Sequence, residues 1–175
     1  MPPTLSVDGY VARVGRSLHG QDERIRAMVR GLRGAKERGN CAWILGNGGS
    51  LAIAQHFAQD LLKLVGIRAQ AVTCPSLITA YSNDASFQRV FLDPIKVLRR
   101  SGDPVIIFSC SGKSRNYSGF KRRIDGLLMA VVGTDGGFLA ARADVCVKVK
   151  SMDYQVCETA FCVVADLILK ELMNA

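Results

Sequence analysis

Five short, mainly apolar segments, separated by segments with helical spacing, restrict the fold of this chain more than any other feature. The first run, residues 41–45, is apolar throughout, which is typical of a strand buried on both faces of a parallel sheet. Strands that alternate with helices predict parallel βαβ units with right-handed crossovers. We therefore expect an α/β fold, a three-layer doubly wound sandwich around a five-stranded parallel sheet. The predicted strands span residues 41–45, 69–74, 105–108, 127–132 and 145–149.

The segments around these runs have helical character. Residues 5–38 place apolar side chains near a helical period, and we expect residues 19–22 to interrupt this long segment. A chain of 175 residues has the size of one domain, which we predict to be a helical segment (1–40) followed by an α/β core (41–175). The other predicted helices span 51–62, 75–81, 86–100, 116–123 and 155–173, with a turn at Asn83-Asp84 and an exit loop over 133–137.

Composition and charge narrow the class of protein. No apolar run approaches the ~20 residues that span a membrane, and residues 1–4 lack the basic-then-apolar order of a signal peptide. The six cysteines form no CxxC pair, so we expect reduced thiols in a cytoplasmic protein without membrane contact. The net charge of +8 favours an acidic partner, either a phosphorylated metabolite, a nucleic acid or an acidic protein. Nucleic acid is the weaker candidate because no aromatic residues interleave with the basic ones.

The loop of residues 109–114 follows the third predicted strand and has the composition of a phosphate-binding site. It holds Ser109, Ser111 and Ser114 together with a glycine and a lysine. At a strand-to-helix turn the first helical N–H groups lack intrahelical partners and the helix dipole is positive, so a phosphate can accept their hydrogen bonds. The serine hydroxyls add further donors. The alternative is that these serines only cap the following helix.

A second loop, residues 46–50, follows the first predicted strand. It is not a dinucleotide motif, because Leu51 stands where G-x-G-x-x-G requires its last glycine. The serine loop is likewise not a Walker A motif, because Ile107 occupies the position of that motif's first glycine. Either loop alone could be a structural turn. Ligands of open α/β sheets bind beyond the carboxyl ends of the strands, so two such loops at matching strand ends favour a binding role.

Several motifs follow one another along most of the chain: Gly46-Asn47-Gly48-Gly49-Ser50, His56-Phe57-Ala58, Ser82-Asn83-Asp84, the Ser-x-Ser-Gly-x-Ser loop and Val132-Gly133-Thr134-Asp135-Gly136-Gly137. Together and in this order they resemble the sugar isomerase (SIS) domain family and, within it, the phosphoheptose isomerases. The resemblance implies a flavodoxin-like sheet and a homotetramer whose phosphosugar sites lie between subunits. In the serine loop, Cys110 replaces the family's usual threonine or glycine, and Lys113 its usual asparagine. The residues that the resemblance assigns to phosphosugar binding are Asn47, Gly48, Gly49, Ser50, Asn83, Asp84, Ser109, Cys110, Ser111 and Ser114.

The candidate catalytic residues depart from the family pattern. His56 and Asp60 lie four residues apart on one predicted helix face, with aspartate in place of the family's glutamate. The family's glutamine–glutamate pair falls on Cys157 and Glu158, and its later catalytic histidine falls on Ala165. Glu158 is our candidate for moving protons between C1 and C2 of a sugar, and its structural alternative is a charge at the start of a helix. Two carboxylates, Asp60 and Glu158, facing one polyol could raise each other's pKa.

This scheme requires no cofactor, although the resemblance implies zinc in some relatives. A zinc ion in this chain would have His56, Asp60 and Cys157 as its ligands, with Cys157 as a soft thiolate. The alternative for Cys157 is a buried structural thiol.

Two functions from different classes remain open. The leading one is that of a phosphosugar isomerase, an intramolecular oxidoreductase that converts sedoheptulose 7-phosphate to an aldoheptose 7-phosphate. The other is a non-catalytic SIS regulator that binds a phosphosugar or a protein, similar to a replication-initiator-associating relative. Retention of His56, Asp60 and Asn83-Asp84 favours the enzyme, whereas Ala165 in place of a histidine favours the regulator.

Overall fold

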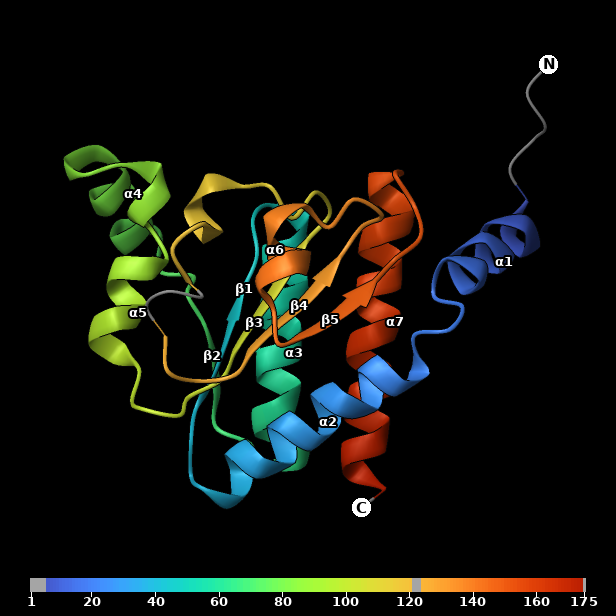
Figure 1. Ribbon diagram of the computed structural model, residues 1–175, viewed down its shortest axis with the longest axis horizontal. Helices are drawn as coiled ribbons and strands as arrows, with labels where there is room; N and C mark the ends of the chain where they lie inside the picture. The colour runs from blue at the N-terminus through green and yellow to red at the C-terminus, as the bar shows by residue number, and fades with distance from the viewer. Residues whose placement is uncertain (1–5, 121–123, 175) are drawn as a thin grey trace.

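The fold is a five-stranded parallel sheet covered by helices on both faces, seen in a computed structural model that describes residues 6–120 and 124–174 (Figure 1). The strand order is β2-β1-β3-β4-β5, and every neighbouring pair is parallel. This confirms the predicted α/β class and the flavodoxin-like sheet. The strands are β1 (Ala42–Leu45), β2 (Ala69–Ala71), β3 (Val105–Ser109), β4 (Leu128–Val132) and β5 (Val145–Lys148). The helices are α1 (Val7–Ser17), α2 (Asp22–Glu37), α3 (Gly49–Val65), α4 (Pro75–Asp84), α5 (Leu92–Leu98), α6 (Gly137–Arg142) and α7 (Tyr154–Met173), with 3₁₀ turns η1 (Phe87–Arg89) and η2 (Arg115–Tyr117).

Two cores explain why the strands are continuously apolar. Every residue of β1, β3 and β4 is buried. Because successive side chains of a strand point to opposite faces, Ile44 joins the core beneath α2, α3 and α7, whereas Trp43 and Leu45 join the core beneath α5 and α6. The three central strands therefore have no solvated face.

The N-terminal segment is interrupted as expected. A turn over residues 18–20 separates α1 from α2, and Gly20 adopts a φ of +77° there. Directly after this turn the side-chain oxygen of Gln21 accepts the Lys148 N–H at 2.9 Å. The Ser17 carbonyl accepts the Lys150 N–H at 2.8 Å. These hydrogen bonds hold the turn between α1 and α2 against the end of β5.

Two predicted elements differ in the structure. Residues 86–100 form η1 and then α5, not one helix, because Pro94 cannot donate an intrahelical hydrogen bond and is tolerated only in the first turn of α5. Asn83 and Asp84 end α4 and do not form a separate turn.

The segment after the serine loop also differs from its prediction. Instead of a helix from residue 116, it begins with the 3₁₀ turn η2, in which the Tyr117 N–H donates to the Ser114 carbonyl at 3.0 Å. Asn116 and Tyr117 are both buried, and Gly119 is a poor helix former. Residues 121–123 of the predicted helix lie outside the described part of the chain. The exit loop over 133–137 leads into α6, which the sequence reasoning missed.

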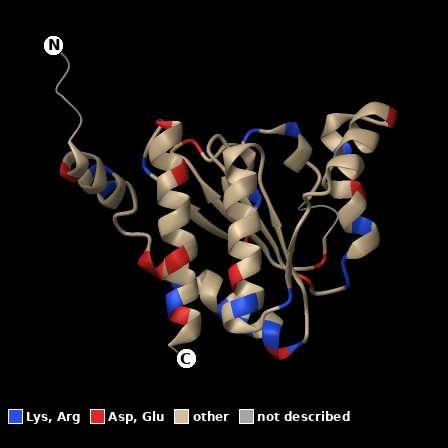
Figure 2. Ribbon diagram, turned by 180° about the vertical axis from the view of Figure 1, so that it is seen from behind, with Lys and Arg blue, Asp and Glu red and all other residues tan. Residues whose placement is uncertain are grey.

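Charged side chains are distributed over many elements. Lys and Arg residues occur on several helices and loops and do not collect on one face (Figure 2). Within residues 6–120 and 124–174, no helix combines the length and apolar character that would let it cross a bilayer.

Candidate active site

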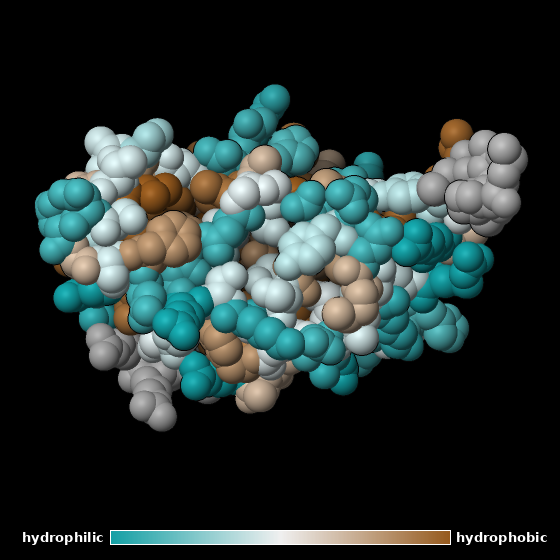
Figure 3. Space-filling model, turned by 90° about the horizontal axis from the view of Figure 1, so that it is seen from above, coloured by the Kyte–Doolittle hydropathy of each residue, from teal (hydrophilic) through white to brown (hydrophobic). Residues whose placement is uncertain are grey.

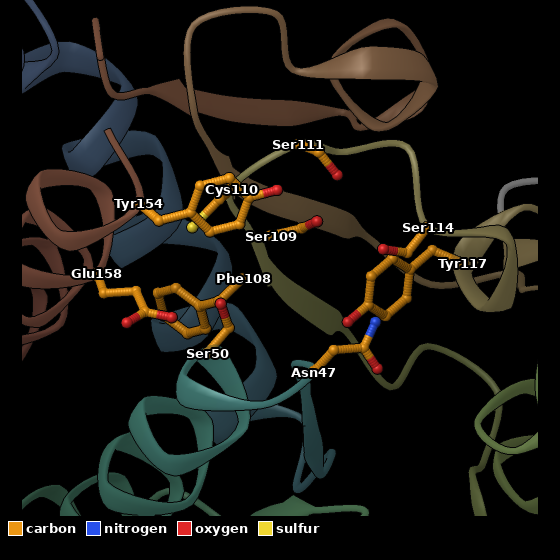
Figure 4. A pocket seen from close by; sticks show the side chains of 10 residues that line it. All are labelled: Asn47, Ser50, Phe108, Ser109, Cys110, Ser111, Ser114, Tyr117, Tyr154 and Glu158. Carbon is orange, nitrogen blue, oxygen red and sulfur yellow. The ribbon is translucent and has the colours of Figure 1, made fainter. Parts of the chain in front are cut away.

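A cavity of about 90 Å³ lies where β1 and β3 end, at the point where the strand order reverses. Open α/β sheets bind their ligands at such a point. Hydrophilic and intermediate side chains predominate around the middle of this face of the molecule (Figure 3). The side chains around the cavity come from the two loops, the end of β3, the turn η2 and the start of α7 (Figure 4). They are Asn47, Ser50, Phe108, Ser109, Cys110, Ser111, Ser114, Tyr117, Tyr154 and Glu158.

The serine loop uses its own N–H groups to orient its hydroxyls. The Gly112 N–H donates to Ser109 Oγ at 3.1 Å, and the Lys113 N–H donates to Ser111 Oγ at 3.2 Å. A hydroxyl oxygen that accepts such a bond still has its own O–H to donate. The loop can therefore offer hydroxyl donors to an anion in the cavity, even though a 3₁₀ turn and not an α-helix follows it.

Gly112 allows the serine loop to pack against the loop that follows β4. It has a φ of +61°, and a Cβ at this position would lie 2.0 Å from the Gly136 carbonyl oxygen. Lys113 Nζ and Asp135 Oδ2 also join the two loops at 2.8 Å, and this hydrogen bond lowers the pKa of Asp135. The shape of the serine loop thus depends on close contact with a second loop.

Glu158 approaches the loop of residues 46–50 from the first turns of α7. The N-cap of that helix is Asp153, whose side chain accepts the N–H groups of Gln155 and Val156. An added Cβ at Gly49 would lie 2.4 Å from Glu158 Oε1. The carboxylate can lie against the start of α3 only because residue 49 has no side chain.

Asn47 and Tyr117 line the side of the cavity opposite Glu158, and sequence reasoning missed Tyr117 (Figure 4). It also missed Asn116, which contacts Asn47 without lining the cavity itself. Asn47 and Asn116 exchange two amide hydrogen bonds, at 3.3 and 2.9 Å. The Tyr117 ring stacks on Phe91, with the ring centroids 5.7 Å apart and the planes 1° from parallel. The only available signal for Asn116 and Tyr117 was their position just after the serine loop. Tyr154, also missed, begins α7.

Two thiols, Cys110 of the serine loop and Cys157 of α7, lie next to each other. Cys157 is 1% exposed, and its Sγ donates to the Ser151 carbonyl at 3.4 Å. The pKa of Cys110 is raised by its side-chain hydrogen bond with Cys157 and by burial. Cys110 therefore presents a neutral thiol to the cavity near neutral pH.

His56 and Asp60 do not line this cavity. They face each other on α3, with His56 Nε2 3.4 Å from Asp60 Oδ2, and the histidine side chain is 68% exposed. Because an α-helix rises ~1.5 Å per residue, Asp60 lies roughly 15 Å along α3 from Ser50. Asp60 and Glu158 therefore do not face one cavity within a single chain.

Two further predicted regions lie elsewhere. Asn83 Nδ2 donates to Asp84 Oδ1 at 2.8 Å in an exposed position at the end of α4. Ala165, at the position of the family's histidine, is 5% exposed and belongs to the core.

The predicted zinc ligands do not gather in one chain. Among the residues that the structure describes, no three or more histidine, cysteine, aspartate or glutamate side chains form a group that could hold a metal ion. His56 and Asp60 are together, but the Cys157 thiol donates to Ser151 and contacts Cys110. Zinc binding stays a prediction.

The sheet order and the two loops at its switch point define a SIS-type domain, and comparisons with known proteins identify its family. No model of a known protein family matches the chain. The chain is 35% identical over 164 residues to a phosphoheptose isomerase of Geobacter metallireducens, which covers 86% of this chain and 87% of the relative. The structure of a phosphoheptose isomerase from Neisseria gonorrhoeae aligns with a TM-score of 0.88 at 25% identity, over 96% of this chain and 95% of that one. A Francisella tularensis phosphoheptose isomerase shares the fold, with a TM-score of 0.88 at 20% identity over 96% and 94% of the two chains.

The chain therefore belongs to the phosphoheptose isomerase family. This confirms the resemblance that the ordered motifs indicated.

Proposed function

We propose that this protein is an aldose–ketose isomerase that converts sedoheptulose 7-phosphate to an aldoheptose 7-phosphate. One observation carries the proposal: the Glu158 carboxylate lines the same cavity as the hydroxyl-bearing side chains of the serine loop. The cavity thus combines donors for a phosphate with a group that can move a proton. Membership of the phosphoheptose isomerase family supports this substrate.

The serine loop holds the phosphate end of the sugar. Ser109 and Ser111 each accept a backbone N–H, which orients their hydroxyls as donors, and Ser114 lines the cavity beside them. Hydrogen bonds to a charged phosphate are stronger than neutral ones. Fixing one end of the chain-like sugar restricts where the other end can lie, so the reacting carbons stay near the base.

Glu158 moves the proton between carbons. Its carboxylate removes a proton from C1 of the ketose and returns it to C2, while a hydroxyl proton passes from O1 to O2. The carbonyl thereby moves from C2 to C1, and no atom is gained or lost. In Figure 4 the Glu158 side chain lies across the cavity from Ser114 and Tyr117, which agrees with separate phosphate and proton-transfer ends.

The assembly that we propose is a homotetramer with sites between subunits. Large apolar side chains remain exposed on α1, α3 and α7, and their burial against other copies would stabilise an oligomer. His56 and Asp60 are on the same helix α3, so a neighbouring subunit could bring them to a shared sugar site. Light scattering of the purified protein measures the assembly. The exposed apolar residues on these three helices include Val7, Val11, Leu62, Leu64, Val163 and Leu167.

Proton NMR of sedoheptulose 7-phosphate in D₂O tests the proposed reaction. We expect the native protein to introduce deuterium next to the carbonyl and to form aldose. Glu158→Gln should lower this exchange by about 10²–10⁴-fold, because the amide cannot act as a base. Glu171→Gln, near the far end of the same helix, is the matched control and should exchange like the native protein. Equal exchange by the native protein and Glu158→Gln would contradict the role of Glu158.

A second function is favoured by one observation, the buried Ala165 at the position of the family's catalytic histidine. A non-catalytic phosphosugar-binding regulator would bind sedoheptulose 7-phosphate in calorimetry and introduce no deuterium. The same NMR experiment therefore separates the two functions.

A further inference from the structure

The Tyr117 hydroxyl is a buried donor that finds no partner among the residues that the structure describes. The residue is 1% exposed, and within residues 6–120 and 124–174 its Oη has no hydrogen-bond partner. Buried polar side-chain atoms nearly always have a partner, and an unpaired one costs folding free energy. Tyr117 also lines the cavity that holds the serine loop. A molecule that enters this cavity could therefore supply the acceptor that the Tyr117 hydroxyl lacks.

The surroundings hold the phenol ring in place and leave its hydroxyl free. The ring stacks on Phe91, and the Tyr117 N–H donates to the Ser114 carbonyl at 3.0 Å. The nearby Asn47 amide is already engaged, since it exchanges two hydrogen bonds with Asn116. Figure 4 shows the hydroxyl projecting toward the cavity between Ser114 and Asn47. The hydroxyl is thus preorganised for a ligand atom.

The charge state of Tyr117 suits a donor to an anion. Burial raises the pKa of its phenol, so the group keeps its proton at neutral pH. A neutral O–H donates to a phosphate oxygen without the repulsion that a phenolate would cause. Ser114, three residues earlier, lines the same side of the cavity.

We propose that Tyr117 Oη donates a hydrogen bond to the phosphate group of the ligand and is a fourth hydroxyl in the serine-loop site. The phosphate contact does not depend on catalysis. The inference therefore rests on the proposed function only for the identity of the sugar. A role in holding phosphate affects substrate and transition state alike, so it should change KM and leave kcat nearly unchanged.

Tyr117→Phe tests the proposal, because it removes only the hydroxyl and keeps the ring stacked on Phe91. We expect the affinities for inorganic phosphate and for sedoheptulose 7-phosphate, measured by calorimetry, to fall about ten- to hundredfold. KM should rise by a similar factor. The melting temperature of the ligand-free variant should equal or exceed that of the native protein, since the variant has lost an unpaired buried polar group. Tyr10→Phe, whose hydroxyl contacts Thr159 Oγ1 at 3.0 Å on α7, is the control and should keep native phosphate affinity.

Native affinity of Tyr117→Phe for both probes would overturn the proposal. So would a lower melting temperature without ligand, because the hydroxyl would then have a structural partner. Absence of phosphate and phosphosugar binding to the native protein would overturn it as well. If the native protein binds these probes in a Tyr117-dependent way but does not turn over sedoheptulose 7-phosphate, the isomerase proposal fails and the Tyr117 assignment stands. If turnover is normal and Tyr117→Phe has native KM and affinity, only the Tyr117 assignment fails.

Discussion

The two ends of the parallel sheet differ in how fully the protein satisfies their polar groups. At the amino end of β3, Asp103 is 2% exposed, and its carboxylate accepts four hydrogen bonds. At the carboxyl end, the serine hydroxyls face a cavity, and Tyr117 Oη has no partner within the described residues. The polar cluster around Asp103 stabilises the fold, whereas the cluster at the carboxyl end has hydroxyls left to bind the ligand that we propose. Three substitutions test this difference between the two ends of the sheet. The donors to Asp103 are Asn40 Nδ2, Cys41 N, Trp43 Nε1 and Arg100 N.

Asp103→Ala should have the largest effect and should act on stability alone. It leaves several buried donors without an acceptor, so we expect the free energy of unfolding to fall by roughly 3–4 kcal/mol. Urea denaturation measures this loss. Phosphate affinity of the folded variant should stay native, and Asp166→Ala, at an exposed position on α7, is the control. A change in affinity without a loss of stability would remove the distinction between the two ends.

The Asp103 carboxylate should make a contribution to folding stability that is lost in acid. Burial would raise the pKa of Asp103, but the hydrogen bonds that it accepts outweigh this effect and lower the pKa. A lowered pKa in the folded state contributes stability above the unfolded value of about 3.9. That contribution is lost as the pH falls through the lower folded value. The acid limb of the stability curve should be shallower in the Asp103 variant than in the native protein.

Gly49→Ala should act on catalysis and leave stability nearly intact. The added Cβ would lie 2.4 Å from Glu158 Oε1, the end of a flexible side chain that can move aside. Because a misplacement of ~1 Å in a catalytic group can cost on the order of 10²-fold, we expect kcat to fall by about that factor. Gly15→Ala on α1, where an added Cβ meets nothing within 4 Å, is the control for a helical glycine. Native kcat in Gly49→Ala would show that the position of Glu158 does not matter.

Ser111→Ala should have the smallest effect of the three substitutions, and it should change ligand affinity. Losing one hydrogen bond to a charged phosphate should weaken sedoheptulose 7-phosphate binding by ~1.5–3 kcal/mol, measured by calorimetry. Its melting temperature should change little, because the hydroxyl's protein contact is a single bond from the Lys113 N–H. Ser118→Ala, exposed and a few residues along the chain, should bind like the native protein. Unchanged affinity of Ser111→Ala would indicate that the serine loop has a role other than phosphate binding.

Local patterns in the sequence predicted much of the fold. The continuous apolar runs identified the buried strands, since a strand covered on both faces must be apolar at every position. The motifs of the two loops were also recognisable, and so was a break in the N-terminal helical segment, which was predicted over residues 19–22 and lies at 18–20. The boundaries around Pro94 and the 3₁₀ turn after Ser114 were predicted less well. Proline confines α5 to the residues around and after it, and burial of Asn116 and Tyr117 before the poor helix former Gly119 leaves only a short turn.

The sequence by itself determined the parallel sheet, the two loops at its strand ends and the family, because these depend on periodicity and on short contiguous motifs. Only the tertiary structure decided which carboxylate reaches the cavity. Asp60 and Glu158 were both candidates, and the contact between Gly49 and the first turns of α7 places Glu158 there. Likewise, Tyr117 became a candidate only when its turn and its stacking on Phe91 directed its hydroxyl inward. The physical reason is that side-chain direction and burial arise from packing between segments far apart in the chain.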